Sequence, residues 1–167
     1  MKKLVILLNI SILVLLGCAD SDNVSKYKSI LFGELGIVGP ITFSRYRVTT
    51  NGGNIPRGEV TDILIYLKNN GSKTAKDVYA VLNTNSPYVT IYTFDNVIKA
   101  YFGNISANSE SDYGKAVNEN GVVYADYVSY RFWIKSSAPI GNIINFDLSI
   151  TDADGNNWTS NFSITVQ

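Results

Sequence analysis

The chain has 167 residues, of which 14 are basic and 14 acidic, so its formal net charge is zero. It contains no histidine and one cysteine, Cys18, which excludes Ser-His-Asp triads, Cys-His dyads and zinc sites built from His or Cys. No cluster of basic residues follows Lys3, and a duplex-binding protein needs one to displace counterions, so we expect no nucleic-acid partner. We also predict no cofactor and no enzymatic activity.

The first 17 residues, 1–17, have the pattern of an export signal. A short basic segment, Met1 to Lys3, precedes an apolar segment from Leu4 to Leu16 that only Asn9 and Ser11 interrupt. In a helix the apolar segment would reach roughly 20 Å, which is shorter than the ~30 Å hydrocarbon core of a bilayer. Cleavage is therefore favoured over a permanent membrane span. An uncleaved anchor and a plain secreted protein are the alternatives.

The end of this signal, Leu15-Leu16-Gly17-Cys18, resembles the lipobox of bacterial lipoprotein precursors. The resemblance implies cleavage between Gly17 and Cys18 and a diacylglycerol thioether on the Cys18 thiol. Two or three acyl chains, at ~0.8 kcal/mol per buried methylene, would hold the protein stably on a membrane. We expect a lipid anchor in the cell membrane or outer membrane, with the protein facing the periplasm or the cell exterior.

The mature chain is predicted to hold one domain. Residues 18–29 form a lipidated N-terminus and flexible polar tether, and residues 30–167 form the domain. Because Lys2 and Lys3 leave with the signal, 12 basic side chains remain against 14 acidic ones, a net charge of −2. With Cys18 as the only cysteine, the domain has no internal disulfide and must fold by packing alone.

Alternating apolar and polar residues between frequent turn signals predict an all-β fold. The clearest pair is 144–150 and 158–166, which reads as an antiparallel hairpin joined through an Asp-Gly turn. We expect seven to nine strands in all. The other segments with this pattern or a β-rich composition are 41–49, 63–68, 77–82, 97–102 and 127–134.

Three stretches resemble the immunoglobulin-like modules of bacterial surface and secreted proteins, including those called CARDB or cell-adhesion-related domains. They are Gly58–Val60, Leu67–Val78 and Ile150–Trp158, and the likeness spans roughly residues 40 to 167. It implies an immunoglobulin-like antiparallel β-sandwich of about seven to nine strands. It also implies a role as a spacer, scaffold or adhesive module, and it transfers no catalytic residue.

Our candidate partner-binding residues are Tyr127, Arg131 and Trp133. Alternation places them on the face opposite Val128, Tyr130, Phe132 and Ile134, where a polar outer surface is expected. Trp, Tyr and Arg are enriched at binding hot spots. The alternative is that a loop or the N-terminal segment covers this face, or that a bulge shifts the register.

The loop at Asp152, Asp154 and Asn156 is a second, weaker candidate, because its oxygen atoms could bind calcium. The glycine spacing is wrong for an EF-hand and no glutamate closes the loop. A hairpin turn that needs Asp and Gly explains the same residues and is the favoured interpretation.

We therefore favour a lipid-anchored, non-enzymatic binding or scaffold module that recognises a protein or glycan. The alternatives are a structural subunit of an envelope assembly and, in another class, a glycan hydrolase that uses two carboxylates.

Overall fold

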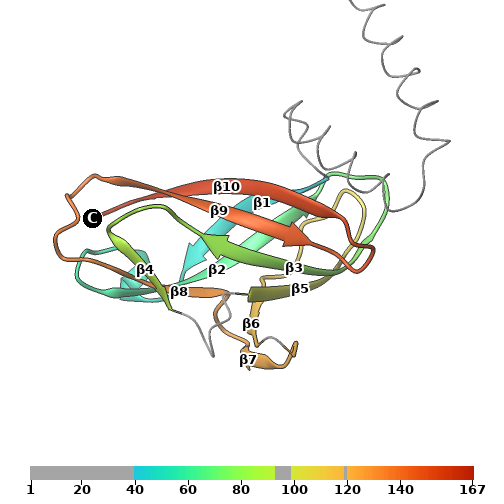
Figure 1. Ribbon diagram of the computed structural model, residues 1–167, viewed down its shortest axis with the longest axis horizontal. Coiled ribbons are helices and arrows are strands. Elements are labelled where there is room, and N and C mark those ends of the chain that lie inside the picture. Colours follow the sequence, from blue (N-terminus) through green and yellow to red (C-terminus); the bar gives the residue numbers. More distant parts are fainter. Residues whose placement is uncertain (1–39, 93–98, 119) are drawn as a thin grey trace, which may run out of the picture. The chain divides into compact units, whose positions relative to one another are not determined.

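The computed structural model describes residues 40–92, 99–118 and 120–167 of this chain. In these ranges ten strands form two antiparallel sheets, and the one helical element is the single-turn 3-10 helix η1 (Asn51–Gly53) (Figure 1). The all-β prediction is confirmed. The predicted signal, Cys18 and the tether lie outside the described residues, as do residues 30–39 of the predicted domain. No helix in the described ranges is long and apolar enough to cross a membrane.

The four-stranded sheet has the order β1-β2-β8-β4, and the six-stranded sheet has the order β10-β9-β3-β5-β6-β7. The strands of the first sheet are β1 (Ile41–Val48), β2 (Val60–Asn69), β8 (Tyr130–Ile134) and β4 (Val89–Tyr92). Those of the second are β10 (Asn157–Thr165), β9 (Ile143–Thr151), β3 (Ala75–Asn83), β5 (Lys99–Ile105), β6 (Lys115–Val117) and β7 (Val123–Ala125).

This strand order is that of an immunoglobulin sandwich. Strands β1, β2, β8 and β4 occupy the A, B, E and D positions, and β10, β9 and β3 occupy the G, F and C positions. Strands β5, β6 and β7 extend the second sheet beyond the C position. The predicted immunoglobulin-like sandwich is thus confirmed. The strand count exceeds the expected seven to nine because β4, β6 and β7 have only three or four residues, too few for a clear alternation.

The core lies between the two sheets and is lined by the apolar faces of the strands. The hairpin β9–β10 forms as predicted, with Phe146 and Phe162 inward. A chain of ring contacts crosses the core. Phe162 lies 4.8 Å from Phe43 of β1 and 5.2 Å from Phe146, which lies 5.2 Å from Phe132 of β8, between ring centroids. Such pairs add about 0.5–1.5 kcal/mol each to the free energy from burial alone.

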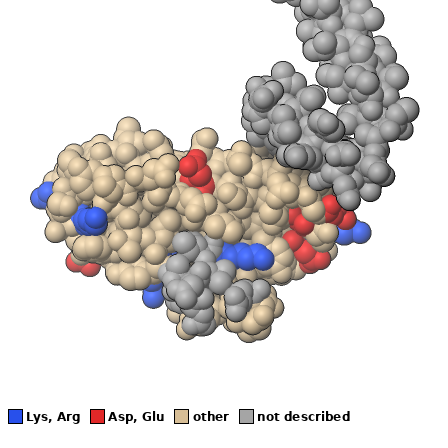
Figure 2. Space-filling model, in the orientation of Figure 1, with Lys and Arg blue, Asp and Glu red and all other residues tan. Residues whose placement is uncertain are grey.

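The outer face of β9 and β10 is nearly uncharged and is polar except at the exposed Ile143. All its residues point away from the core, and Asp147 is the one charged side chain among them. Figure 2 shows this character, because charged side chains on the visible face are few and most of the acidic ones lie toward one end. This face matches the polar side that the alternation in 144–150 and 158–166 predicts.

A bulge in β1 decides which of its residues enter the core. Phe43 pairs with Leu67 and Arg45 pairs with Tyr66, so Ser44 is the extra residue between them. The bulge reverses the alternation at that point. As a result Phe43 packs in the core while Arg45 points out, although an unbroken strand would turn both to the same side.

Gly114 is the tightest glycine in the described chain. A Cβ added to it would lie 2.5 Å from Cζ of the Phe102 ring on β5, well inside van der Waals contact. Gly114→Ala should therefore lower the free energy of unfolding by about 1–3 kcal/mol through overpacking, measured by urea denaturation.

A double mutant separates this clash from a general intolerance of the loop. Phe102→Leu alone should destabilise the protein, but it should recover part of the loss when it is combined with Gly114→Ala. Strictly additive losses would show that the ring is not the cause.

Candidate partner-binding surface

The strand β2 is buried on both faces. Ile63, Ile65 and Leu67 face the core, and Leu64 and Tyr66 on the opposite face are only 2% and 9% exposed. The outer face of the four-stranded sheet is therefore partly covered, rather than open along its length. The cover comes from the chain between β5 and β8, where the Tyr113 ring packs edge-on against Tyr66, 6.4 Å between centroids.

This covering segment passes from one sheet to the other. It first runs along β2, where the amides of Ser111 and Gly114 donate to the carbonyls of Leu67 and Ile65 at 2.8 and 3.1 Å. It then continues as β6, which pairs with β5 in the other sheet. The segment is needed because β8 pairs with only the first four residues of β2, from Val60 to Ile63. The remaining half of that edge would otherwise lack partners.

Two serine hydroxyls complete the hydrogen bonding of this edge. The amide of Leu67 donates to Oγ of Ser111 at 2.9 Å, and the amide of Ile65 donates to Oγ of Ser129 at 3.0 Å. The Ser129 hydroxyl in turn donates to the carbonyl of Gly114. Both serines are buried, at 8% and 2% exposed. Each serine Oγ atom takes the place of the backbone carbonyl that a regular partner strand would offer to the same amide.

An ion pair fixes the centre of the outer face. Nε and Nη2 of Arg131 on β8 donate to Oδ1 and Oδ2 of Asp62 on β2, at 2.6 and 2.8 Å. The two residues are direct cross-strand partners, and Asp62 is 5% exposed. These hydrogen bonds are the main reason that the pKa of Arg131 lies above its ordinary value, and the nearby Tyr127 and Tyr92 contribute.

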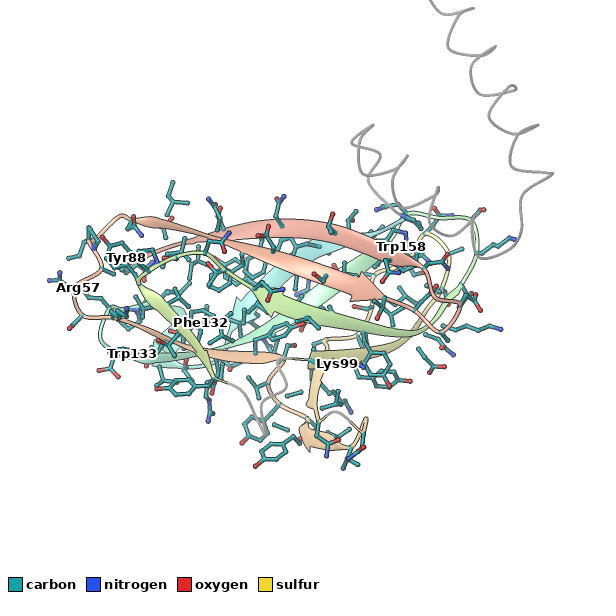
Figure 3. All side chains as sticks on the ribbon, viewed as in Figure 1. Arg57, Tyr88, Lys99, Phe132, Trp133 and Trp158 are labelled. Carbon is teal, nitrogen blue, oxygen red and sulfur yellow. The ribbon has the colours of Figure 1, made fainter. Side chains whose placement is uncertain are left out.

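The three predicted binding residues lie close together on this face. Trp133 and Arg131 are half-buried on the side of β8 away from the core, whereas their neighbour Phe132 is fully buried (Figure 3). Tyr127 lies in the loop before β8 and is 66% exposed. The predicted alternation on β8 is confirmed. Tyr92 of β4, 43% exposed and paired with Arg131, joins the group.

A hollow of about 410 Å³ lies beside this group, over β1 and β2. Leu64 and Asp62, which are nearly fully buried and form its floor, and the exposed Tyr127 are among its lining residues. The full set of lining residues is Arg47, Thr49, Thr50, Asp62, Leu64, Tyr113 and Tyr127.

The sequence analysis did not predict the other residues of this surface, although the sequence holds signals for some of them. The run from Ile63 to Leu67 is apolar at every position, which is typical of a strand buried on both faces. Asp62 and Arg131 are charges of opposite sign within otherwise largely apolar strands, as a cross-strand ion pair would require. Arg47, Ser111, Tyr113 and Ser129 carried no such signal.

The calcium candidate loop is built as a turn. Oδ1 of Asp152 accepts hydrogen bonds from the backbone amides of Asp154 and Asn156 at 3.0 and 2.9 Å, and the Asn156 side chain donates to the same carboxylate. These contacts are the ones that the turn interpretation needs. No group of three His, Cys, Asp or Glu residues that could hold a metal ion occurs in the described ranges. Calcium binding at this loop stays a prediction.

No protein-family model and no curated protein matches this sequence. Similar solved structures include the archaellum periplasmic stator complex of FlaF and FlaG from Sulfolobus acidocaldarius, with 12% identity over 77% of this chain and 90% of that one, and a TM-score of 0.33. A conjugative transposon lipoprotein from Bacteroides eggerthii has 16% identity over 75% and 96%, and a TM-score of 0.32.

A PapD-like domain of human CEP192 has 9% identity over 77% of this chain and 83% of that one, and a TM-score of 0.31. At such identities and TM-scores, these likenesses bear on neither the function nor the partners of this chain. The resemblance to CARDB-type modules also stays a prediction.

The serine contacts can be tested by removing one hydroxyl. Ser129→Ala leaves the buried amide of Ile65 without its acceptor, so it should lower the free energy of unfolding by about 1–3 kcal/mol in urea denaturation. Ser163→Ala is the matched control, because Ser163 points outward from β10 and is exposed. Equal stability of the two variants would refute the proposed role of Ser129.

Proposed function

We propose that this chain is a lipid-anchored, extracytoplasmic binding or scaffold module without enzymatic activity. The export-signal pattern of residues 1–17 and the Leu15–Cys18 motif support attachment through a lipid on Cys18. The immunoglobulin-like sandwich supports a module that presents a surface. The partner is a protein or glycan of the cell envelope.

The observation that carries the binding role is the outer face of the four-stranded sheet. It brings Trp133, Tyr127 and Tyr92 together around Arg131, all of them at least partly exposed. Large aromatic residues and arginine dominate the energetics of recognition surfaces. The opposite side of the sandwich, over β9 and β10, presents mostly short polar side chains instead, with Ile143 as the exception.

The surface is also rigid before any partner arrives. Trp133 and Arg131 lie on a strand that is paired on both sides, and the Arg131 guanidinium is held by the two hydrogen bonds that it donates to Asp62. A side chain already held in place loses little conformational entropy when it binds. This arrangement therefore favours recognition by preformed contacts.

Lipidation is tested by intact mass and cell fractionation in a bacterium that processes lipoproteins. The wild-type protein should start at Cys18, carry acyl mass and sit in the membrane fraction, because the thioether forms on that thiol. Cys18→Ser should carry no lipid and leave the membrane fraction. A wild-type protein that retains Met1 or stays soluble would contradict the anchor.

The binding surface is tested with Trp133→Ala, using crosslinking in envelopes of the native host to identify and quantify the partner. Loss of a hot-spot residue costs about 2 kcal/mol or more, so affinity should fall by about thirtyfold. The melting temperature should fall less than for Phe132→Ala, because Phe132 is fully buried and Trp133 is not.

Full partner affinity in Trp133→Ala would contradict this surface. Self-association that persists in this variant on sizing columns would instead favour a structural subunit. The place for such assembly is the edge strand β7, where Val123 and Tyr124 are exposed and the exposed Val122 precedes them.

A further inference from the structure

The hollow on the outer face is a shallow depression that is open to solvent and lined by both apolar and polar groups. Its volume of about 410 Å³ lies within the usual range for ligand pockets, roughly 300–1,000 Å³. It combines an apolar floor at Leu64 with the rings of Tyr113 and Tyr127 and with hydroxyl, carboxylate and guanidinium groups. A ligand for this lining must itself have an apolar face and several hydrogen-bonding groups.

The polar groups at the floor of the hollow are fixed in place. The Asp62 carboxylate accepts the two hydrogen bonds from Arg131, which leaves lone pairs on both oxygens for further donors. Thr50 Oγ1 accepts a hydrogen bond from the Asp62 amide at 3.0 Å, so its own proton can be donated elsewhere. The lining thus offers both an acceptor, the Asp62 carboxylate, and a donor, the Thr50 hydroxyl, and the hydroxyls of a sugar can bind to both.

The charge at the rim adds a further requirement. Arg131 neutralises Asp62, and Arg47, which is exposed, forms no ion pair with any residue that the structure describes. By contrast Arg45, two residues earlier on β1, is paired with Glu110 at 2.8 Å. The remaining charge of the hollow is therefore positive, and a guanidinium fork matches a carboxylate in two parallel hydrogen bonds.

We infer that the hollow binds one acidic sugar residue of a glycan. The sugar carboxylate binds Arg47, its hydroxyls bind Asp62 and Thr50, and its C–H face lies against Tyr127. This inference rests on the proposed binding role of the outer face and specifies the chemistry of its ligand. An acidic peptide could also pair with Arg47, Asp62 and Thr50, but the rings of Tyr113 and Tyr127 in the lining favour a sugar, whose C–H face can lie flat on them.

The test is calorimetric titration of the mature lipidated protein, which starts at Cys18, in detergent micelles with trigalacturonate. Saturable binding is expected, and Arg47→Gln should weaken it by about tenfold or more, because it removes the charge-assisted pair. Tyr127→Ala should also weaken it. Arg45→Gln is the matched control, since Arg45 is already paired, and it should change the affinity less than about twofold.

Three outcomes would overturn the inference: no heat of binding with trigalacturonate, equal affinity in the wild type and Arg47→Gln, or equally tight binding of triglutamate. Maltotriose, which lacks carboxylates, should bind at least about tenfold more weakly than trigalacturonate, and equal binding would remove the role of Arg47.

If trigalacturonate does not bind while Trp133→Ala still abolishes binding of the envelope partner, the ligand class is wrong and the proposed function stands. If both fail, the outer face is not a binding surface.

Discussion

The arrangement of this domain depends on how β2 satisfies its second edge. β8 is only five residues long and reaches no further than Ile63, so the backbone groups that Ile65, Leu67 and Asn69 direct to this edge need other partners. Leaving such groups buried and unpaired costs about 1–3 kcal/mol each. The crossing segment and the hydroxyls of Ser111 and Ser129 supply those partners. The path of the crossing segment is thus determined by the need to pair the backbone groups of β2.

The same solution shapes the surface. To reach β2, the crossing segment lies over the outer face of the four-stranded sheet, and it carries Tyr113 and Tyr127 beside Leu64 and Asp62. The hollow is the space that this cover leaves open. Asp62 then has little contact with water, and Arg131 compensates its charge. Hydrogen bonding in the sheet, the hollow and the fixed arginine therefore have one structural origin.

The sequence predicted the parts of the fold that local alternation determines. The β9–β10 hairpin and the inward set of β8, from Tyr130 to Ile134, follow from a period of two and an Asp-Gly turn. The bulge at Ser44 could not be predicted, because it depends on packing between Phe43 and Phe162, which lie near opposite ends of the domain's sequence. Strands β6 and β7 are too short to show a period.

Likewise, only the part of the candidate site that lies on a single strand could be predicted from the sequence. Arg131 and Trp133 follow from alternation within one strand, and the structure places both on the outer face as expected. Asp62, Arg47 and Tyr113 come from segments far apart in the sequence, so their approach depends on strand order and on the crossing segment. A pattern within one segment cannot specify contacts between distant segments.

The contact between β1 and β10 has a consequence for folding. The Phe43 amide donates to Oγ of Ser160, which lies 117 residues further along the chain, and Phe43 stacks on Phe162. Contacts at such separations form slowly because a long loop must close first. Because the ribosome makes the N-terminal end first, β1 can pair with β2 early but cannot make its contacts with β10 until β10 has been synthesised. Assembly of the core is completed only when almost the whole domain has been synthesised, so the ring of Phe43 lacks its Phe162 partner during that interval.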